Sequence, residues 1–86
     1  MRTIWKFALE VTGVPQVFDV PRGAKVVRVA EQNGKVAMWV DVDTKRPVDE
    51  RTYQIFGTGH TVPEDAIYMG SADMKPFVWH VFEAAR

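Results

Sequence analysis

The residues best suited to chemistry form one short run, Gly57-Thr58-Gly59-His60. Glycine permits positive φ angles and lets a ligand approach the backbone closely. Consecutive amides in such a run can form a small nest that binds an anion, and Thr58 and His60 would add a hydroxyl and an imidazole. The run indicates a loop that binds a phosphate or carboxylate. The alternative is a tight turn whose glycines only permit its path. The run Gly57-Thr58-Gly59-His60 has neither the P-loop pattern, which ends in Lys-Ser or Lys-Thr, nor the Rossmann glycine spacing.

The two histidines do not predict a metal site. Proteins usually bind a metal through three or four His, Cys, Asp or Glu ligands. Here His60 and His80 lie far apart in the sequence, and the chain has no cysteine. We therefore expect no metal. The lack of cysteine also excludes disulfides and thiol chemistry.

Carboxylates give the weakest chemical signal. Asp41 and Asp43 share a predicted strand face with Trp39, and paired carboxylates beside a tryptophan are compatible with glycoside chemistry. A hydrolase built on His60 with Asp41 or Asp43 is a related alternative. We favour a solvated strand face, since no serine, threonine or lysine stands in a nucleophile motif. We predict no catalytic residue, no cofactor and no enzymatic activity.

The balanced charge of the chain argues against non-specific binding of nucleic acid. Eleven basic residues balance eleven acidic ones, whereas nucleic-acid binding depends on a basic face. A local basic patch remains an alternative if turns gather the cations, with aromatic rings to stack bases. Its members would be Arg22, Lys25, Arg28, Lys45, Arg46 and Arg51.

The elements that must position these residues are strands. With 86 residues the chain is one domain, residues 1–86. Period-2 alternation of apolar residues, interrupted by turn residues at regular spacing, predicts an all-β fold. We expect a small antiparallel barrel or sandwich of about six or seven short strands, with at most one helical turn at 63–66. The expected strands are 3–11, 16–20, 25–31, 36–43, 51–56, 66–69 and 77–82, with connections at 44–50 and 70–75.

The strongest local prediction is a hairpin at Asn33-Gly34, because both central residues of a type I′ turn need positive φ. Alternation places Val36, Met38, Val40 and Val42 on one face of its second strand. In its first strand it groups Val27 with Val29, opposite Val26. We expect the tryptophan-bearing faces to point into the core.

The last strand, 77–82, is apolar on both faces except for His80. Such a strand is normally covered on both sides, so it is either central in a sheet or meets a partner. We expect His80 to be partly buried or to lie at an interface. The candidate interface residues are Phe77, Trp79, His80 and Phe82, and a homo-oligomer is possible.

Nothing in the sequence predicts a membrane protein. The N-terminal segment has no apolar run of signal-peptide length, and no segment approaches the roughly 20 apolar residues that span a bilayer. The absence of cysteine fits a reducing cytoplasm.

The chain resembles small phage and prophage proteins grouped as a domain of unknown function. The resemblance covers nearly the whole chain and departs at 44–50 and 72–76. The segments that carry it are Thr3-Ile4-Trp5-Lys6-Phe7, Pro21-Arg22-Gly23-Ala24-Lys25, Gln32-Asn33-Gly34-Lys35, Met38-Trp39, Val42-Asp43, Gly57-Thr58-Gly59-His60, Tyr68-Met69-Gly70-Ser71 and Phe77-Val78-Trp79-His80-Val81-Phe82-Glu83.

This resemblance implies a phage or prophage origin and the cytoplasm of a host cell. Small accessory phage proteins usually act by binding. The expected function is therefore non-enzymatic: inhibition of a host protein, or sequestration of a small anionic, nucleotide-like ligand. The alternative is a structural or virion-associated module that assembles with copies of itself.

Overall fold

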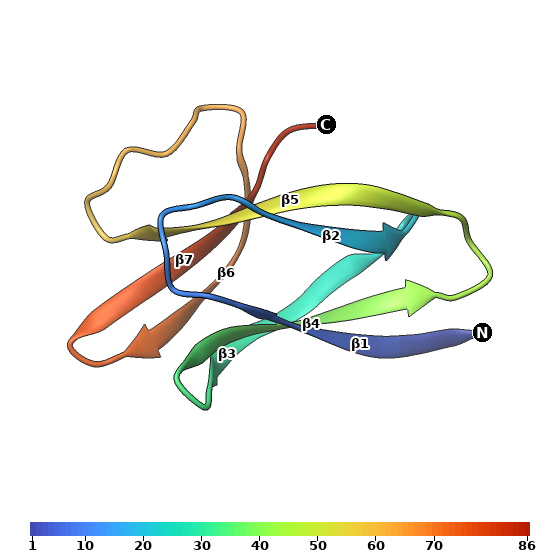
Figure 1. The fold of residues 1–86 in the computed structure, drawn as a ribbon, viewed down its shortest axis with the longest axis horizontal. Coiled ribbons are helices and arrows are strands. Elements are labelled where there is room, and N and C mark those ends of the chain that lie inside the picture. Colours follow the sequence, from blue (N-terminus) through green and yellow to red (C-terminus); the bar gives the residue numbers. More distant parts are fainter.

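The computed structural model describes residues 1–86 as seven strands in two antiparallel sheets, with no helix (Figure 1). The all-β prediction is confirmed. The strands are β1 (Arg2–Leu9), β2 (Gln16–Pro21), β3 (Lys25–Gln32), β4 (Lys35–Asp43), β5 (Val48–Gly57), β6 (Ile67–Met74) and β7 (Phe77–Glu83).

One sheet has the strand order β1-β4-β3 and the other β2-β5-β7-β6. The two sheets approach most closely where β3 meets β6. A Cβ built on Gly70 in β6 would lie 2.8 Å from Cβ of Val29 in β3, closer than two such atoms can sit. The glycine therefore allows the backbone of β6 to pack directly on the Val29 side chain of β3. These two strands belong to different sheets and share no hydrogen bonds, so their contact closes the sandwich on this side, as in a barrel.

The core lies between the sheets, and β4 supplies most of one wall. Val36, Met38, Val40 and Val42, which the alternation grouped on one face, are fully or almost fully buried. The second sheet contributes Tyr53, Ile55 and Val81 to the same core. The buried cluster consists of Leu9, Val20, Ala24, Val36, Met38, Val40, Val42, Tyr53, Ile55, Ala72 and Val81.

The expectation that all three tryptophans point inward is wrong for Trp39. Trp5 and Trp79 are partly buried and pack against the core. Trp39 lies on the other face of β4 from Met38 and Val40. The guanidinium of Arg28 lies 5.3 Å from its ring centroid. The period of two makes this unavoidable, because Met38 and Val40 take the inner positions.

The hairpin at Asn33-Gly34 is confirmed. Both residues have positive φ, 53° and 78°, and Gln32 pairs with Lys35 across the turn. Because a two-residue turn sets the register, the pairing runs regularly back from the turn as far as Arg28.

A β-bulge at Val27 reverses the predicted faces of the first half of β3. Val26 pairs with Val40 and Arg28 with Trp39, which leaves Val27 unpaired. Val26 and Val29 both pack against the core, while Val27 is exposed. The grouping of Val27 with Val29 was therefore wrong, since one extra residue shifts the phase of the alternation.

Two strands are longer than predicted. β5 already begins at Val48, which pairs with Pro21 of β2, so the segment 48–50 is strand and not connection. β6 continues through the expected loop to Met74, past a second bulge between Tyr68 and Gly70. At 63–66 the chain makes a turn, closed by a hydrogen bond from the Ala66 amide to the Pro63 carbonyl (3.1 Å), and no helix forms.

The last strand is central in its sheet. β7 pairs with β5 on one side and β6 on the other, which explains why it is apolar on both faces. Its inner face packs on the core, and its outer face carries His80 and Phe82. The structure contains no helix of the length and hydropathy required to cross a bilayer.

Candidate binding site

The loop at Gly57-Thr58-Gly59-His60 is a turn closed by its own histidine. The His60 amide donates to the Gly57 carbonyl (3.0 Å), and the Gly57 amide donates to Nδ1 of His60 (3.0 Å). Because Nδ1 accepts this bond, the neutral ring carries its proton on Nε2. The Gly57 amide is thus used within the turn, which removes one donor from the predicted anion nest.

Gly57 is required by packing as well as by the path of the turn. A Cβ at this position would lie 2.9 Å from Cε1 of His60 and 3.2 Å from Cζ3 of Trp79. The glycine therefore allows an imidazole and an indole to converge on one point of the backbone. This contact links the loop directly to β7.

The loop and the turn between β6 and β7 enclose a groove of about 400 Å³. Phe77 and Trp79 form a tilted ring pair with centroids 5.4 Å apart, and Phe77 is 58% exposed. The residues that line the groove are Gly57, Thr58, His60, Pro76, Phe77, Val78 and Trp79. The structure therefore brings together three residues of the predicted binding loop and two of the predicted interface residues. Gly59 does not line the groove.

His80 lies outside the groove, in a chain of polar contacts on the outer face of its sheet. Its Nε2 is 2.9 Å from Oγ1 of Thr58, and its Nδ1 is 2.7 Å from Oγ of Ser71. Ser71 Oγ lies in turn 2.7 Å from the hydroxyl of Tyr68. We call these four residues the His80 relay. It joins β6, β7 and the loop after β5.

Sequence reasoning missed Tyr68 and Ser71. Residues three apart in a regular strand lie on opposite faces. The bulge between Tyr68 and Gly70 adds one residue, so both hydroxyls reach the same face. Gly70, two residues after Tyr68 and directly before Ser71, was the available signal, since an isolated glycine in a strand often marks a bulge.

The His80 relay does not form a catalytic triad. A hydroxyl at 2.7 Å from an imidazole nitrogen has the spacing of a nucleophile and its base, but a triad also needs a third group that orients the base. The second ring nitrogen contacts the hydroxyl of Thr58, not a carboxylate. The Thr58 contact of His80 links the loop after β5 to β7.

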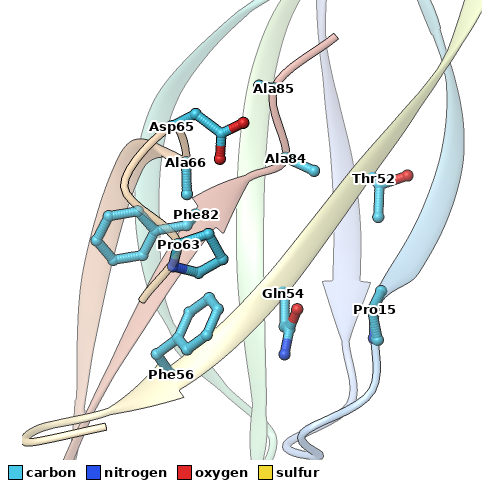
Figure 2. Close-up of a pocket in the computed structure, with 10 residues that line it drawn as sticks. All are labelled: Pro15, Thr52, Gln54, Phe56, Pro63, Asp65, Ala66, Phe82, Ala84 and Ala85. Atoms are coloured by element: carbon cyan, nitrogen blue, oxygen red, sulfur yellow. The ribbon is translucent and has the colours of Figure 1, made fainter. Parts of the chain in front are cut away.

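Phe82 lies in an aromatic cluster farther along the same face. Its ring is 5.6 Å from that of Phe56 and 5.4 Å from that of Tyr68. Figure 2 shows Phe56 and Phe82 beside Pro63, with Gln54 and Pro15 on the other side of a hollow of about 190 Å³. Phe82 therefore packs beneath the 58–66 loop instead of standing at the open groove.

Comparison with protein families matches residues 1–86 to DUF7352, a domain of unknown function. The chain belongs to this family. No curated protein and no solved structure matches it.

The hydrolase grouping of His60 with Asp41 or Asp43 is not formed in this DUF7352 chain. Asp41 accepts two hydrogen bonds from Nε of Arg2 and one from Nη2 (2.7 to 3.1 Å). These bonds lower the pKa of its carboxyl below the ordinary range. Asp43 accepts from the Lys45 amide (3.0 Å) and the N-terminal amine (3.2 Å), which lowers its pKa too. Both carboxylates are thus held by neighbours other than His60.

Part of the predicted basic patch does assemble. Arg22, Lys25 and Arg46 line a hollow of about 380 Å³ together with Arg2 and the two aspartates. Arg22 is also paired with Asp49 through Nε (3.1 Å). Arg28 is not a member, because it lies over Trp39. No group of three or more His, Cys, Asp or Glu side chains is placed to hold a metal ion.

Proposed function

We propose that this chain works by binding, without catalysis, and that a segment of a partner protein occupies the groove beside Phe77. The observation that supports this proposal is the exposed Phe77 ring packed on Trp79 at the mouth of the groove. Exposed aromatic side chains at a concave site are the typical anchors of protein interfaces. The His80 relay and the Gly57 contacts hold the opposite wall in place.

The groove favours a protein segment over a small anion. No lysine or arginine lines it, and the Gly57 amide already donates to His60. An anion there would have only the hydroxyl of Thr58 and Nε2 of His60 as side-chain donors. An apolar or aromatic side chain of a partner would instead gain contact with two rings and Pro76.

The proposed setting follows from the resemblance noted above. It suggests a phage or prophage protein in the cytoplasm of a bacterial host, acting on a host protein. The alternative is that the chain sequesters a nucleotide-like anion at Gly57-Thr58-Gly59-His60. That version predicts thermal stabilisation by nucleotides that is lost on Thr58→Ala and retained on Phe77→Ala.

A second candidate function is assembly with copies of itself through the C-terminal strand. β7 is central in its sheet, so its edges are already paired. Self-association would have to use the exposed Phe77 end. Light scattering at high protein concentration tests this version. A strict monomer contradicts it, and a dimer that Phe77→Ala dissociates supports it.

The main experiment measures partner affinity in matched variants. The partner is captured from host lysate with the wild-type chain, purified and titrated by calorimetry. Phe77→Ala should weaken binding about tenfold or more, because aromatic anchors contribute about 2 kcal/mol or more. Ile4→Ala is the control, since Ile4 is similarly exposed (51%) but lies on the other sheet. Equal affinities for wild type and Phe77→Ala would refute the proposed groove.

A further inference from the structure

A further pocket lies at the end of β7 opposite Phe77, next to Glu83. Its volume is about 370 Å³. Its charged residues are Lys25, Arg51, Glu83 and Arg86, and apolar side chains include Val26 and Met69. The side chains that line it therefore carry three positive charges and one negative charge, in a protein whose total charge is zero.

Arg51 is the buried cation of this pocket, with only 6% of its surface exposed. Its Nη1 donates to the Ala24 carbonyl (3.1 Å), which fixes the guanidinium in place. Its Nε lies 3.9 Å from Oε2 of Glu83, too far for a hydrogen bond. Nε is buried without a hydrogen-bond partner.

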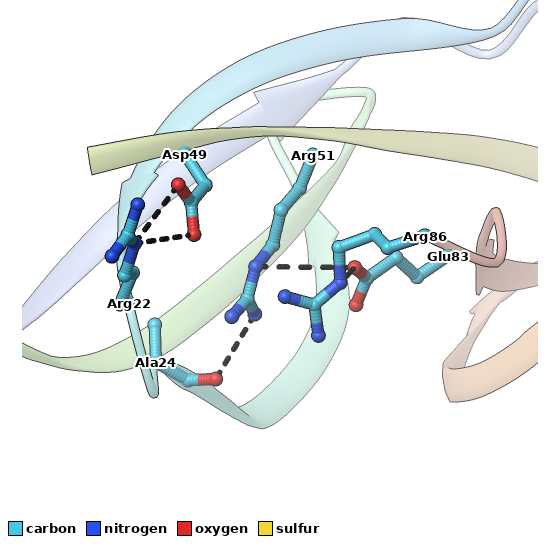
Figure 3. A network of polar contacts seen from close by, with 6 residues as sticks. All are labelled: Arg22, Ala24, Asp49, Arg51, Glu83 and Arg86. Carbon is cyan, nitrogen blue, oxygen red and sulfur yellow. Dashed lines mark hydrogen bonds and ion pairs between the residues drawn. The ribbon is translucent and has the colours of Figure 1, made fainter. Parts of the chain in front are cut away.

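Glu83 is shared between two cations. It is 3% exposed, and its Oε2 lies 3.0 Å from Nε of Arg86 as well as 3.9 Å from Nε of Arg51. Neither contact has the geometry of a hydrogen bond, so Oε2 is also unsatisfied. Figure 3 shows the two guanidinium groups side by side with the one carboxylate next to them.

This arrangement leaves the buried charge of Arg51 incompletely paired. Arginine does not lose its proton in proteins, so the pocket cannot become neutral by titration of Arg51 or Arg86. A buried charge is costly unless it is paired and hydrogen-bonded. One carboxylate cannot fully pair two guanidinium groups. A second anion would supply the missing partner.

We propose that this pocket binds the oxyanion group of a small ligand, a phosphate or a carboxylate. A planar guanidinium presents paired N–H donors that match two oxygens of such a group. Arg86, whose side chain is half exposed, would close over the anion from the solvent side, with Arg51 as the fixed donor and Lys25 at the rim. Val26 and Met69 would contact an apolar part of the ligand. This site is separate from the groove at Phe77, so either proposal can fail alone.

Calorimetric titration with inorganic phosphate and with acetate, at ionic strength held constant with sodium chloride, tests the proposal. Saturable binding of phosphate alone, or of acetate alone, identifies the head group. Arg86→Gln removes one guanidinium from a half-exposed position. It should weaken binding about tenfold or more, as expected for loss of a charge-assisted hydrogen bond. Arg46→Gln removes the same charge from the neighbouring basic hollow and should change affinity less than about twofold.

Two results would overturn the proposal. One is the absence of saturation with both anions. The other is an equal loss of affinity in Arg86→Gln and Arg46→Gln, which would mean that diffuse charge attracts the anion. Arg51→Lys, which keeps the charge but loses the planar fork, should also bind more weakly than wild type. If this variant fails to fold, the Arg86→Gln comparison still decides.

Discussion

Two polar clusters meet β7 from opposite faces, and they differ in how completely their groups are paired. In the His80 relay, both ring nitrogens and the hydroxyls of Thr58, Ser71 and Tyr68 lie 2.7 to 2.9 Å from a partner. In the cluster around Arg51 and Glu83, a donor and an acceptor are buried without a hydrogen bond. The first cluster is held by hydrogen bonds and the second by charge.

This difference is the reason why we propose an anion site at the charged cluster and not at the His80 relay. Hydroxyls and an imidazole on a partly exposed face can satisfy one another, so a ligand would have to break existing bonds. The buried guanidinium of Arg51 and the half-exposed guanidinium of Arg86 share one carboxylate, so in our proposal they gain from a second anion. The two clusters are thus distinguished by how completely their polar groups are paired.

The largest expected effect is on the charged cluster. Glu83→Gln leaves the buried Arg51 without an anionic neighbour, which should lower the free energy of unfolding by about 3–5 kcal/mol. Urea unfolding of the variant and the wild type measures this loss.

The matched control replaces both buried partners. In the double variant Arg51→Met with Glu83→Met, no buried charge of the pair remains, so it should be more stable than Glu83→Gln alone. A Glu83→Gln variant as stable as the wild type would show that Arg51 is paired by solvent, and the contrast between the clusters would disappear.

A smaller effect is expected in the His80 relay. Ser71→Ala removes the central hydroxyl, and solvent can replace it at this partly exposed position. The free energy of unfolding should fall by about 1 kcal/mol, again measured in urea. Asp73→Ala on the same strand is the control, since no hydrogen bond is broken there. A loss as large as that of Glu83→Gln would contradict the assignment of the relay as a neutral, satisfied network.

Alkaline pH should lower the stability of the fold through Tyr53, whose ring is fully buried beside the charged cluster. Burial raises the pKa of its hydroxyl, and the negative charge of Glu83 raises the pKa further, opposed in part by Arg51. Because the folded protein holds this proton more tightly than the unfolded chain, stability should be intact below about pH 10 and fall above it. Thermal unfolding from pH 8 to 11 measures the decline, which Tyr53→Phe should make shallower.

The smallest effect is expected for Tyr53→Phe at pH 7. The Tyr53 hydroxyl is buried without a hydrogen-bond partner, so its removal should change the free energy of unfolding by less than about 0.5 kcal/mol, or raise it. Thermal unfolding of the two proteins settles the sign. A loss above about 1 kcal/mol would mean that Arg51 bonds this hydroxyl in solution and that the charged cluster is better paired than its geometry shows.

Local pattern was sufficient for much of the fold. Alternation in 36–42 grouped the residues that form the buried face of β4, and Asn33-Gly34 predicted the tight hairpin. It failed at Val27 and near Met69, where bulges shift the phase. A bulge is decided by how the bulged strand meets its neighbours across the core. At Gly70 that neighbour is Val29, which is distant in sequence.

Some of the site residues could be recognised from the sequence, and others could not. The run at 57–60 and the aromatic strand 77–82 stood out as sequence, because glycine beside histidine and unbroken apolar residues are local features. Their meeting in one groove depends on β5 and β7 being neighbours. The sequence indicated Arg51 only as a member of a surface basic patch, since an arginine in a polar-apolar alternation looks like a solvated side chain, and Arg86 carried no local signal.

The sequence by itself determined the all-β class, the hairpin and which residues of β4 share a face, because the side-chain period of a strand and the φ preferences of a turn are local properties. Only the tertiary structure decided that Arg51 is buried and that Arg86 shares its carboxylate. It also decided that His80 joins Tyr68, Ser71 and Thr58. These outcomes depend on strand order and on two bulges, which arise from packing between segments far apart in the chain.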